Sequence, residues 1–261
     1  MVVIESYIEK QNNIDKRSIR TGVNQEFLAV LDGMREVFGG RQEWYDETYR
    51  PKLHKYGCGV VAAVNTYLYL AGITKVTKEG YMSLVEEFIQ MCPLSRFCLN
   101  TGLGVLPWQM SSYIKRKCRA AGIRVNPDWL GRAGVDSLYE KMKAALSEDT
   151  PVIWAFFNLK PSHKIQFYKY INGEYRDTYI DEHDMERRYD DVNSHYVTVT
   201  AVYEREVDGH LQRWVEISSW GSRYYVNYEE FQSFVRNAGG RLNPVNLING
   251  YCSNILFIKK L

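Results

Sequence analysis

The feature that most constrains this chain is a change of pattern at Pro151. Before it, apolar residues recur at helical spacing in four segments, 58–71, 78–91, 107–121 and 134–147. After it, "PVIWAFFNL" has the composition of a buried strand, and "HYVTVTAVY" alternates apolar and polar residues. The sequence therefore predicts an α+β fold, in which a helical lobe is followed by an antiparallel β-sheet lobe.

Further signals divide the chain into three parts. Asp208-Gly209 favours a hairpin turn, and "NGE" at 172–174 favours another turn. "IQFYKYI", "RWVEISSW", "RYYVN" and "CSNILFIKK" are further strand patterns, and one helix is expected at about 228–238. "NQEFLAVLDGMREVF" has helical spacing. We therefore expect an N-terminal helical extension at 1–45, a helical lobe at 46–150 and a β lobe at 151–261.

The net charge and the lack of a long apolar run count against two classes of partner, nucleic acids and membranes. The 33 basic and 31 acidic residues give a net charge of +2, which does not indicate nucleic-acid binding. No run approaches the ~20 apolar residues that cross a bilayer, so no membrane partner is expected. "MVVIESYIEKQNN" lacks the layout of a signal peptide. We expect a cytoplasmic location, or a secreted one if a signal was removed before residue 1.

The cysteines favour free thiols. Five cysteines is an odd number, and no pair has zinc-ligand spacing with histidines nearby. Reduced thiols in a reducing compartment are the expected state, and a Cys92–Cys98 bridge is the alternative in an oxidising one. No metal and no organic cofactor is expected.

Cys58 and His195 are the candidate reactive residues. Cys58 lies between two glycines at the start of a helical pattern, where free N–H groups and the helix dipole favour a thiolate. A buried structural cysteine is the alternative. His195 begins a strand and shares a face with Val197 and Val199. Ser218 ends the next strand across a hairpin, about 4.8 Å away in a sheet, so we expect it to face His195.

The order of these elements resembles the papain-like cysteine peptidases, nearest the bacterial bacteriocin-leader-peptidase-like branch. The resembling segments are "YGCGVVAAVNTYLYL", "TGLGVLPWQMSSYIKRKCRAAGI", "DTPVIWAFF", "SHYVTVTAVY" and "ISSWG", spread over roughly residues 50–258. The resemblance implies a papain-like two-lobed fold. Cys58 would be the nucleophile, His195 the general acid/base and Ser218 the residue that orients the imidazole. Gly57 and Gly104 would border the substrate cleft, and Trp220 would shield the site.

Three positions depart from the family pattern. Lys52 stands where the family has a glutamine that helps to hold the oxyanion. Ser218 replaces an asparagine or aspartate, and Gly57 replaces a common aspartate. The side chains left as candidates for the oxyanion donor are His54, Tyr56 and Gln42.

The function expected from these residues is a cysteine peptidase that cleaves peptide or isopeptide bonds through a thioester. Its partner would be a peptide or protein substrate. One alternative is a catalytically inactive papain-like protein that binds peptides, which the departures favour. Another is a cysteine acyltransferase that passes the acyl group to an amine. A cell-wall amidase ranks lower because such enzymes normally lack the "SWG" element.

Overall fold

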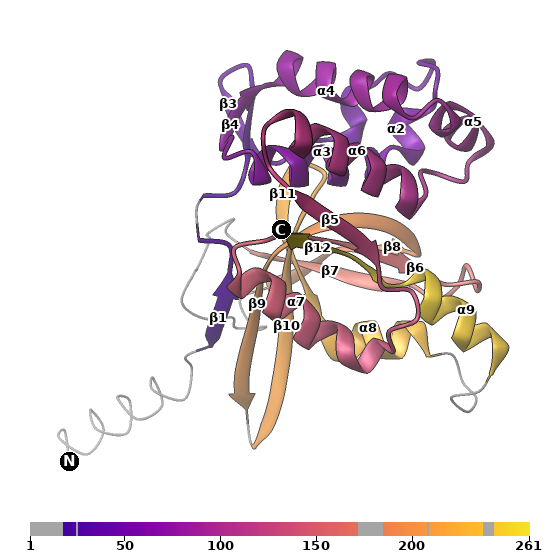
Figure 1. The fold of residues 1–261 in the computed structure, drawn as a ribbon. Helices are drawn as coiled ribbons and strands as arrows, with labels where there is room; N and C mark the ends of the chain where they lie inside the picture. Colours follow the sequence, from indigo (N-terminus) through magenta and orange to yellow (C-terminus); the bar gives the residue numbers. More distant parts are fainter. Residues whose placement is uncertain (1–17, 25, 172–184, 208, 237–242) are drawn as a thin grey trace.

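A large antiparallel sheet forms the centre of the molecule. The computed structural model describes residues 18–24, 26–171, 185–207, 209–236 and 243–261 (Figure 1). In these residues the sheet has nine strands, ordered β5-β12-β6-β9-β10-β11-β7-β8, with β1 paired to β9. Their bounds are β1 Ile19–Gly22, β5 Val125–Trp129, β6 Val152–Phe157, β7 Ile165–Tyr170, β8 Met185–Val192, β9 Ser194–Val207, β10 His210–Ser219, β11 Ser222–Asn227 and β12 Ile255–Lys260. The predicted α+β class with an antiparallel sheet is confirmed.

Helices lie on two sides of this sheet (Figure 1). One group is α2 Leu53–Tyr56, α3 Cys58–Leu70, α4 Lys78–Met91, α5 Leu94–Thr101 and α6 Pro107–Ala120. The other is α7 Leu138–Ser147, preceded by the 3-10 turn η2 Val135–Ser137, with α8 Tyr228–Val235 and α9 Pro244–Cys252. The predicted segments 58–71, 78–91 and 107–121 match α3, α4 and α6 closely. Thr77 caps α4 by accepting from the Gly80 N–H, and Pro107 occupies the first turn of α6.

The sheet begins earlier in the chain than the change of pattern at Pro151 indicates. β5 already pairs with β12, and α7 packs against β9 and β12. Pro127 lies inside β5, which contradicts the usual strand signature. The strand tolerates it because β5 is at the end of the sheet order, where one side needs no ladder hydrogen bonds.

The predicted helix in the N-terminal extension is wrong for the residues that the structure describes. Residues 24–38 instead contain a hairpin of β2 Ala29–Asp32 and β3 Arg35–Phe38, which joins β4 Lys75–Thr77 in a second sheet. Gly33 has φ 63°, so Asp32-Gly33 belongs to a tight turn that breaks the helical spacing. Residues 1–17 lie outside the described part of the chain.

The strands predicted after Pro151 agree with their patterns, whereas β8 Met185–Val192 is a strand that no pattern indicated. Val207 pairs with His210, which closes the predicted hairpin between β9 and β10, although Asp208 itself lies outside the described residues. The "NGE" turn at 172–174 also lies outside them. The pattern at the C-terminus divides into the end of α9 and strand β12.

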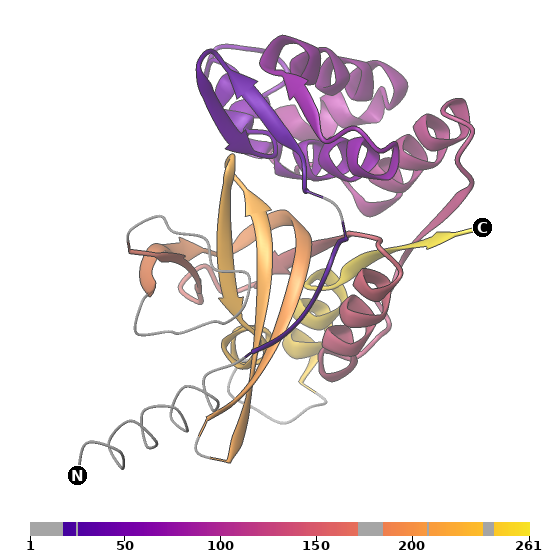
Figure 2. The same ribbon diagram turned by 90° about the vertical axis from the view of Figure 1, so that its left-hand side faces the viewer.

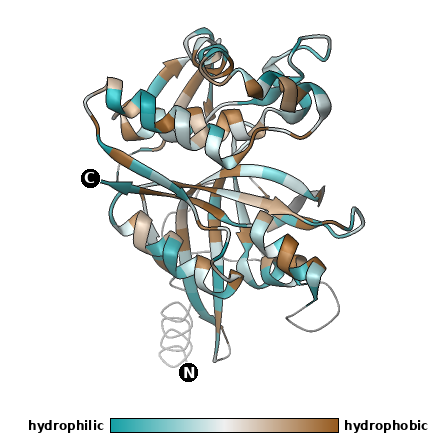
Figure 3. Cartoon of the chain, turned by 45° about the vertical axis from the view of Figure 1, so that its right-hand side comes forward, coloured by the Kyte–Doolittle hydropathy of each residue, from teal (hydrophilic) through white to brown (hydrophobic). Residues whose placement is uncertain are grey.

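Helix α3 lies inside the core because its residues are mostly apolar. Ten of its thirteen residues are buried, so the helix is apolar on nearly every side, as expected for a helix inside a core. Figure 3 shows hydrophobic residues along the strands of the sheet and hydrophilic residues on outer helix faces. In the described part of the chain no helix is both long and apolar enough to cross a membrane.

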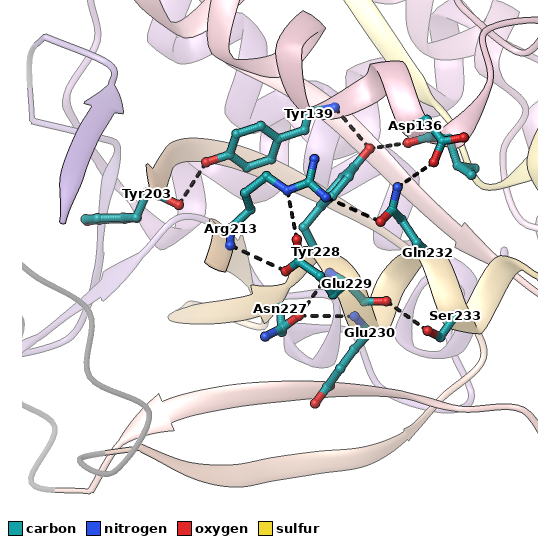
Figure 4. A network of polar contacts seen from close by, with 11 residues as sticks. Asp136, Tyr139, Tyr203, Arg213, Asn227, Tyr228, Glu229, Glu230, Gln232 and Ser233 are labelled. Carbon is teal, nitrogen blue, oxygen red and sulfur yellow. Dashed lines mark hydrogen bonds and ion pairs between the residues drawn. The ribbon is translucent and has the colours of Figure 1, made fainter. Parts of the chain in front are cut away.

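A polar network attaches α7 and α8 to β10 (Figure 4). The Arg213 guanidinium lies over the rings of Tyr139 and Tyr228, at 5.5 and 5.0 Å from their centroids. Its Nε donates to Glu229 at 2.8 Å. The Tyr228 hydroxyl accepts from the Tyr139 N–H at 3.0 Å. The network fixes the two helices to the strand that carries Ser218 and Ser219 at its far end.

Candidate active site

Cys58 is the first residue of α3, as predicted. A side chain at Gly57 would meet the carbonyl oxygen of Leu53 at 2.4 Å, and one at Gly59 would meet Val105 at 2.4 Å. The two glycines therefore allow the helix start to pack closely against α2 and the loop before α6. Gly57, predicted to border the cleft, lines neither of the two cavities described below.

Cys58 and His195 line one small cavity between α3 and the ends of β9 and β10. Its volume is about 10 Å³. The residues lining it are Gln42, Cys58, Val61, Ala62, His195, Tyr196, Ser218, Ser219 and Trp220. The structure thus brings together the predicted residues Cys58, His195, Ser218 and Trp220 from separate parts of the chain.

The partner of His195 is Ser219 rather than the predicted Ser218. His195 Nε2 lies 2.7 Å from Ser219 Oγ. Ser218 Oγ instead donates to the carbonyl oxygen of Phe38 at 2.8 Å. Ser218 therefore holds the N-terminal segment, and Ser219 holds the imidazole through Nε2.

A β-bulge causes this difference. Glu216 pairs with Ala201, but Ile217 pairs with Val199, so the register between β9 and β10 shifts by one residue. Without the shift, Ser218 would stand opposite Val199, on the face that His195 shares. With it, Ser218 stands opposite Thr198, on the other face. A one-residue slip exchanges the two faces of a strand, and so it brings Ser219 to His195.

Trp220 covers the imidazole. Its ring stacks on His195, with centroids 4.3 Å apart and planes 16° apart. Trp220 has φ 46° and Gly221 has φ 67°, in the two-residue turn between β10 and β11. Tryptophan rarely adopts a positive φ, so the turn holds strain that the ring contacts offset. This position supports the predicted shielding role.

Burial favours the neutral form of both Cys58 and His195. It lowers the pKa of His195 from 6.5 to about 3. Burial also raises the pKa of the Cys58 thiol, although the backbone N–H groups of Tyr196, Gly59 and Cys58 oppose that rise. The burial of Cys58 therefore opposes the thiolate that its position at the helix start favours.

The N-terminal segment lies beside the cavity, and apart from Gln42 the sequence indicated none of its residues there. The Phe38 N–H donates to Gly221 O at 3.0 Å, and the Gly221 N–H donates to Gly40 O at 3.1 Å. The Gly40 N–H donates to Asn65 of α3 at 3.0 Å. Figure 2 shows the β2–β3 hairpin directly above the tips of β10 and β11. These bonds bring the next turn, η1 Gln42–Trp44, to Cys58.

Gln42 is the candidate oxyanion donor that lines the cavity. Its Nε2 donates to His54 O at 3.0 Å and reaches Lys55 O at 3.4 Å. Of the other candidates, His54 Nδ1 contacts Tyr45 O at 3.2 Å, and Tyr56 packs beside Gly102. Neither these two nor Lys52 lines the cavity.

A second cavity of about 540 Å³ lies beside the first. Tyr196 lines both of them. Gly104 has φ 67° in the loop that supplies Leu103 and Leu106 to the wall of the larger cavity. Gly104, predicted to border the cleft, itself lines neither cavity.

Comparisons with protein-family models and with curated proteins assign no family to this chain. No protein-family model matches the sequence, and no curated protein matches it either.

Proposed function

We propose that this chain is a papain-like cysteine hydrolase that cleaves peptide or isopeptide bonds. The observation that carries the proposal is the cavity lined both by a cysteine at a helix start and by a histidine whose Nε2 lies 2.7 Å from Ser219 Oγ. Nucleophile, base and a group that orients the base are the three parts of this chemistry. They come from α3, β9 and β10, which is the element order of the papain-like fold.

The first step of the proposed reaction starts from a neutral Cys58 thiol and a neutral His195 imidazole. As the Cys58 sulfur attacks the carbonyl carbon, the thiol proton passes to His195 Nδ1. The tetrahedral intermediate collapses, the C–N bond breaks and the imidazolium gives that proton to the leaving amine. A thioester remains on Cys58. Water then adds to the thioester carbon with His195 as base, and the acid product leaves as the thiol is restored.

The negative charge that develops on the carbonyl oxygen needs donors. The Cys58 N–H at the helix start is one, because the first N–H groups of a helix have no partner within it. The Gln42 amide is the second, since it lines the same cavity. This assignment gives the glutamine role to a residue sixteen positions before the cysteine in place of Lys52.

An inactive peptide-binding protein is the second candidate. The narrow cavity and the raised pKa of the Cys58 thiol favour it. An acyltransferase would use the same residues as the hydrolase, with an amine in place of water.

Cleavage of a mixed peptide library separates these functions. We expect new peptide termini with the wild-type chain and none with Cys58→Ala, while Cys118→Ala, which removes a buried thiol elsewhere, remains active. Added amines that appear in the products would identify acyl transfer. Absence of any cleavage, together with retained peptide binding, would identify the inactive protein.

A further inference from the structure

Strand β9 changes the face on which its apolar side chains lie at Thr200. Val197 and Val199 pack in the main core, and the next residue of β9 in that core is Val202. Ala201 belongs to a second, smaller cluster. A regular strand would put Val199 and Ala201 on one face. The three-residue step from Val199 to Val202 therefore identifies Thr200 as the extra residue of the bulge.

The extra residue places His195 beside Ser219. Thr200 has no opposite residue on β10, because the pairing passes from Ala201 directly to Val199. His195 shares a face with Val199, and Ser219 lies on the same face, with its Oγ 2.7 Å from His195 Nε2. If Thr200 were paired in a regular ladder, His195 would lie on the opposite face from Ser219.

Glu216 binds the side chain of the extra residue. It lies on β10 opposite Ala201, next to the position that the pairing skips. Its Oε1 accepts a hydrogen bond from the Thr200 hydroxyl at 2.7 Å, and its Oε2 accepts one from the Tyr203 hydroxyl at 2.9 Å. Arg223 Nε lies 3.7 Å from Oε1. The carboxylate is thus fixed both to the bulge in β9 and to β11 on the other side of β10.

The backbone of Thr200 is held by the N-terminal segment. The Thr200 carbonyl oxygen accepts from the Val23 N–H at 3.0 Å. This bond follows directly on the pairing of β1 with β9, which ends where Gly22 lies opposite Ala201. The extra residue therefore uses its carbonyl group toward β1 and its hydroxyl group toward Glu216.

The carboxylate of Glu216 lies deep in the protein without contacting the candidate active site. Glu216 and Thr200 are each 1% exposed, and Glu216 lines neither cavity. Removing a charge from water costs free energy unless it is paired and hydrogen-bonded. Fixing the register between two elements is the best-attested use of a buried polar group. At this position the register decides which face of β9 lies beside Ser219.

We propose that Glu216 is a positioning residue, which binds Thr200 and so holds the bulge that places His195 beside Ser219. The inference rests on the proposed function for its effect on catalysis. The contact between His195 and Ser219 is measured separately, without turnover.

Nitrogen-15 NMR of the histidine side chains measures this contact. His195→Gln assigns the His195 signals, and Ser219→Ala gives the Nε2 shift of an imidazole that has lost its hydrogen bond to the serine. Thr200→Val removes the hydroxyl that Glu216 accepts, and we expect it to shift the Nε2 signal as Ser219→Ala does. Glu216→Ala should have the same effect. Thr200→Ser retains the hydroxyl and should retain the wild-type signal.

Steady-state kinetics connect the contact with the proposed reaction. We expect Thr200→Val and Ser219→Ala each to lower kcat/KM about tenfold, the effect of losing one hydrogen bond. Combining them should cost no more than either change alone, because both remove the same contact. Glu216→Gln retains an oxygen that can accept from Thr200, so its kcat/KM should stay within about threefold of wild type.

Thr150→Val is the matched control. Thr150 is also 1% exposed, and its hydroxyl donates to the carbonyl oxygen of Glu148 at 3.1 Å, away from the bulge. The control should leave the His195 signal and kcat/KM unchanged. Thr200→Val keeps the proposal testable if Glu216→Ala does not fold.

The outcomes separate this proposal from the proposed function. A His195 signal that Ser219→Ala or Thr200→Val leaves unchanged would overturn the role of Glu216, whatever the activity. A multiplied loss in the double variant, or an equal loss in Thr150→Val, would also overturn it. If the signal shifts as expected but neither the wild type nor any variant cleaves a peptide, the proposed function is refuted and Glu216 still holds the bulge.

Discussion

Ser218 and Ser219 are neighbours in the chain, but their side chains make different contacts. Ser219 contacts the His195 ring, whereas Ser218 bonds the backbone of Phe38. An uncharged hydrogen bond contributes about 1 kcal/mol, which is roughly a fivefold to tenfold change in rate or equilibrium. The two serines should therefore separate activity from stability.

We expect Ser219→Ala to lower kcat/KM about tenfold with little change in the free energy of unfolding. Ser218→Ala should cost about 1 kcal/mol of stability and leave kcat/KM within about threefold. Steady-state kinetics and urea unfolding of both variants measure the two quantities. The opposite pattern would make Ser218 the residue that orients His195.

The backbone of Trp220 allows its strain to be measured. Its φ of 46° suits asparagine far better than alanine, because asparagine is enriched in the left-handed region. We expect Trp220→Asn to be about 1 kcal/mol more stable than Trp220→Ala. Both variants should lose activity to a similar degree, since both uncover the His195–Ser219 bond. Urea unfolding of the pair gives the comparison, and equal stabilities would show that the turn is unstrained.

At the scale of helices and strands, the sequence predicts some elements and some contacts but not others. The helices α3, α4 and α6 follow from apolar spacing, and the strands from alternation. The partner of His195 does not follow from the sequence. A one-residue bulge leaves the apolar–polar alternation of β10 unchanged, but it changes which face of β10 lies beside His195. The hairpin β2–β3 was read as a helix because its apolar residues also fit helical spacing. Only the turn at Gly33-Met34, between Asp32 and Arg35, distinguishes the two.

The position of Gln42 in the site likewise cannot be predicted from a local sequence pattern. It reaches Cys58 through η1, whose position depends on backbone bonds from Phe38, Gly40 and Gly221. Such long-range pairing has no local pattern, so spacing from the cysteine cannot choose among His54, Tyr56 and Gln42. Cys58 and His195 can be proposed from the sequence because each begins a regular element.

We expect Gln42→Ala to lower kcat/KM by about 100-fold, the usual cost of removing one oxyanion donor. Lys52→Ala, which changes a side chain outside the cavity, should stay within a few-fold of wild type. Circular dichroism checks that both variants fold. A large loss in Lys52→Ala with an active Gln42→Ala would reverse the assignment.

The whole molecule should respond to pH through His195. Its pKa is about 3 in the folded chain and about 6.5 in the unfolded one, so below pH 6.5 the unfolded chain binds a proton that the folded chain does not. Stability is therefore present above pH 6.5 and decreases as the pH falls.

For this one group, the free energy of unfolding should fall by about 2 kcal/mol between pH 7 and pH 5. Urea unfolding of the wild type and of His195→Gln at the two pH values measures the difference in slope. We expect the variant to lose about 2 kcal/mol less than the wild type. Parallel slopes would show that His195 is hydrated rather than buried.

The central claim concerns chemistry between two parts of the molecule, Cys58 on α3 and His195 on β9. The most direct measurement is the mass of the intact chain after brief reaction with p-nitrophenyl acetate near pH 7, followed by peptide mapping. We expect one acetyl group on Cys58 in the wild type, and at least a 100-fold slower acylation in His195→Ala. Equal rates with and without His195, or acetylation that favours Cys92, Cys98, Cys118 or Cys252 over Cys58, would contradict the account.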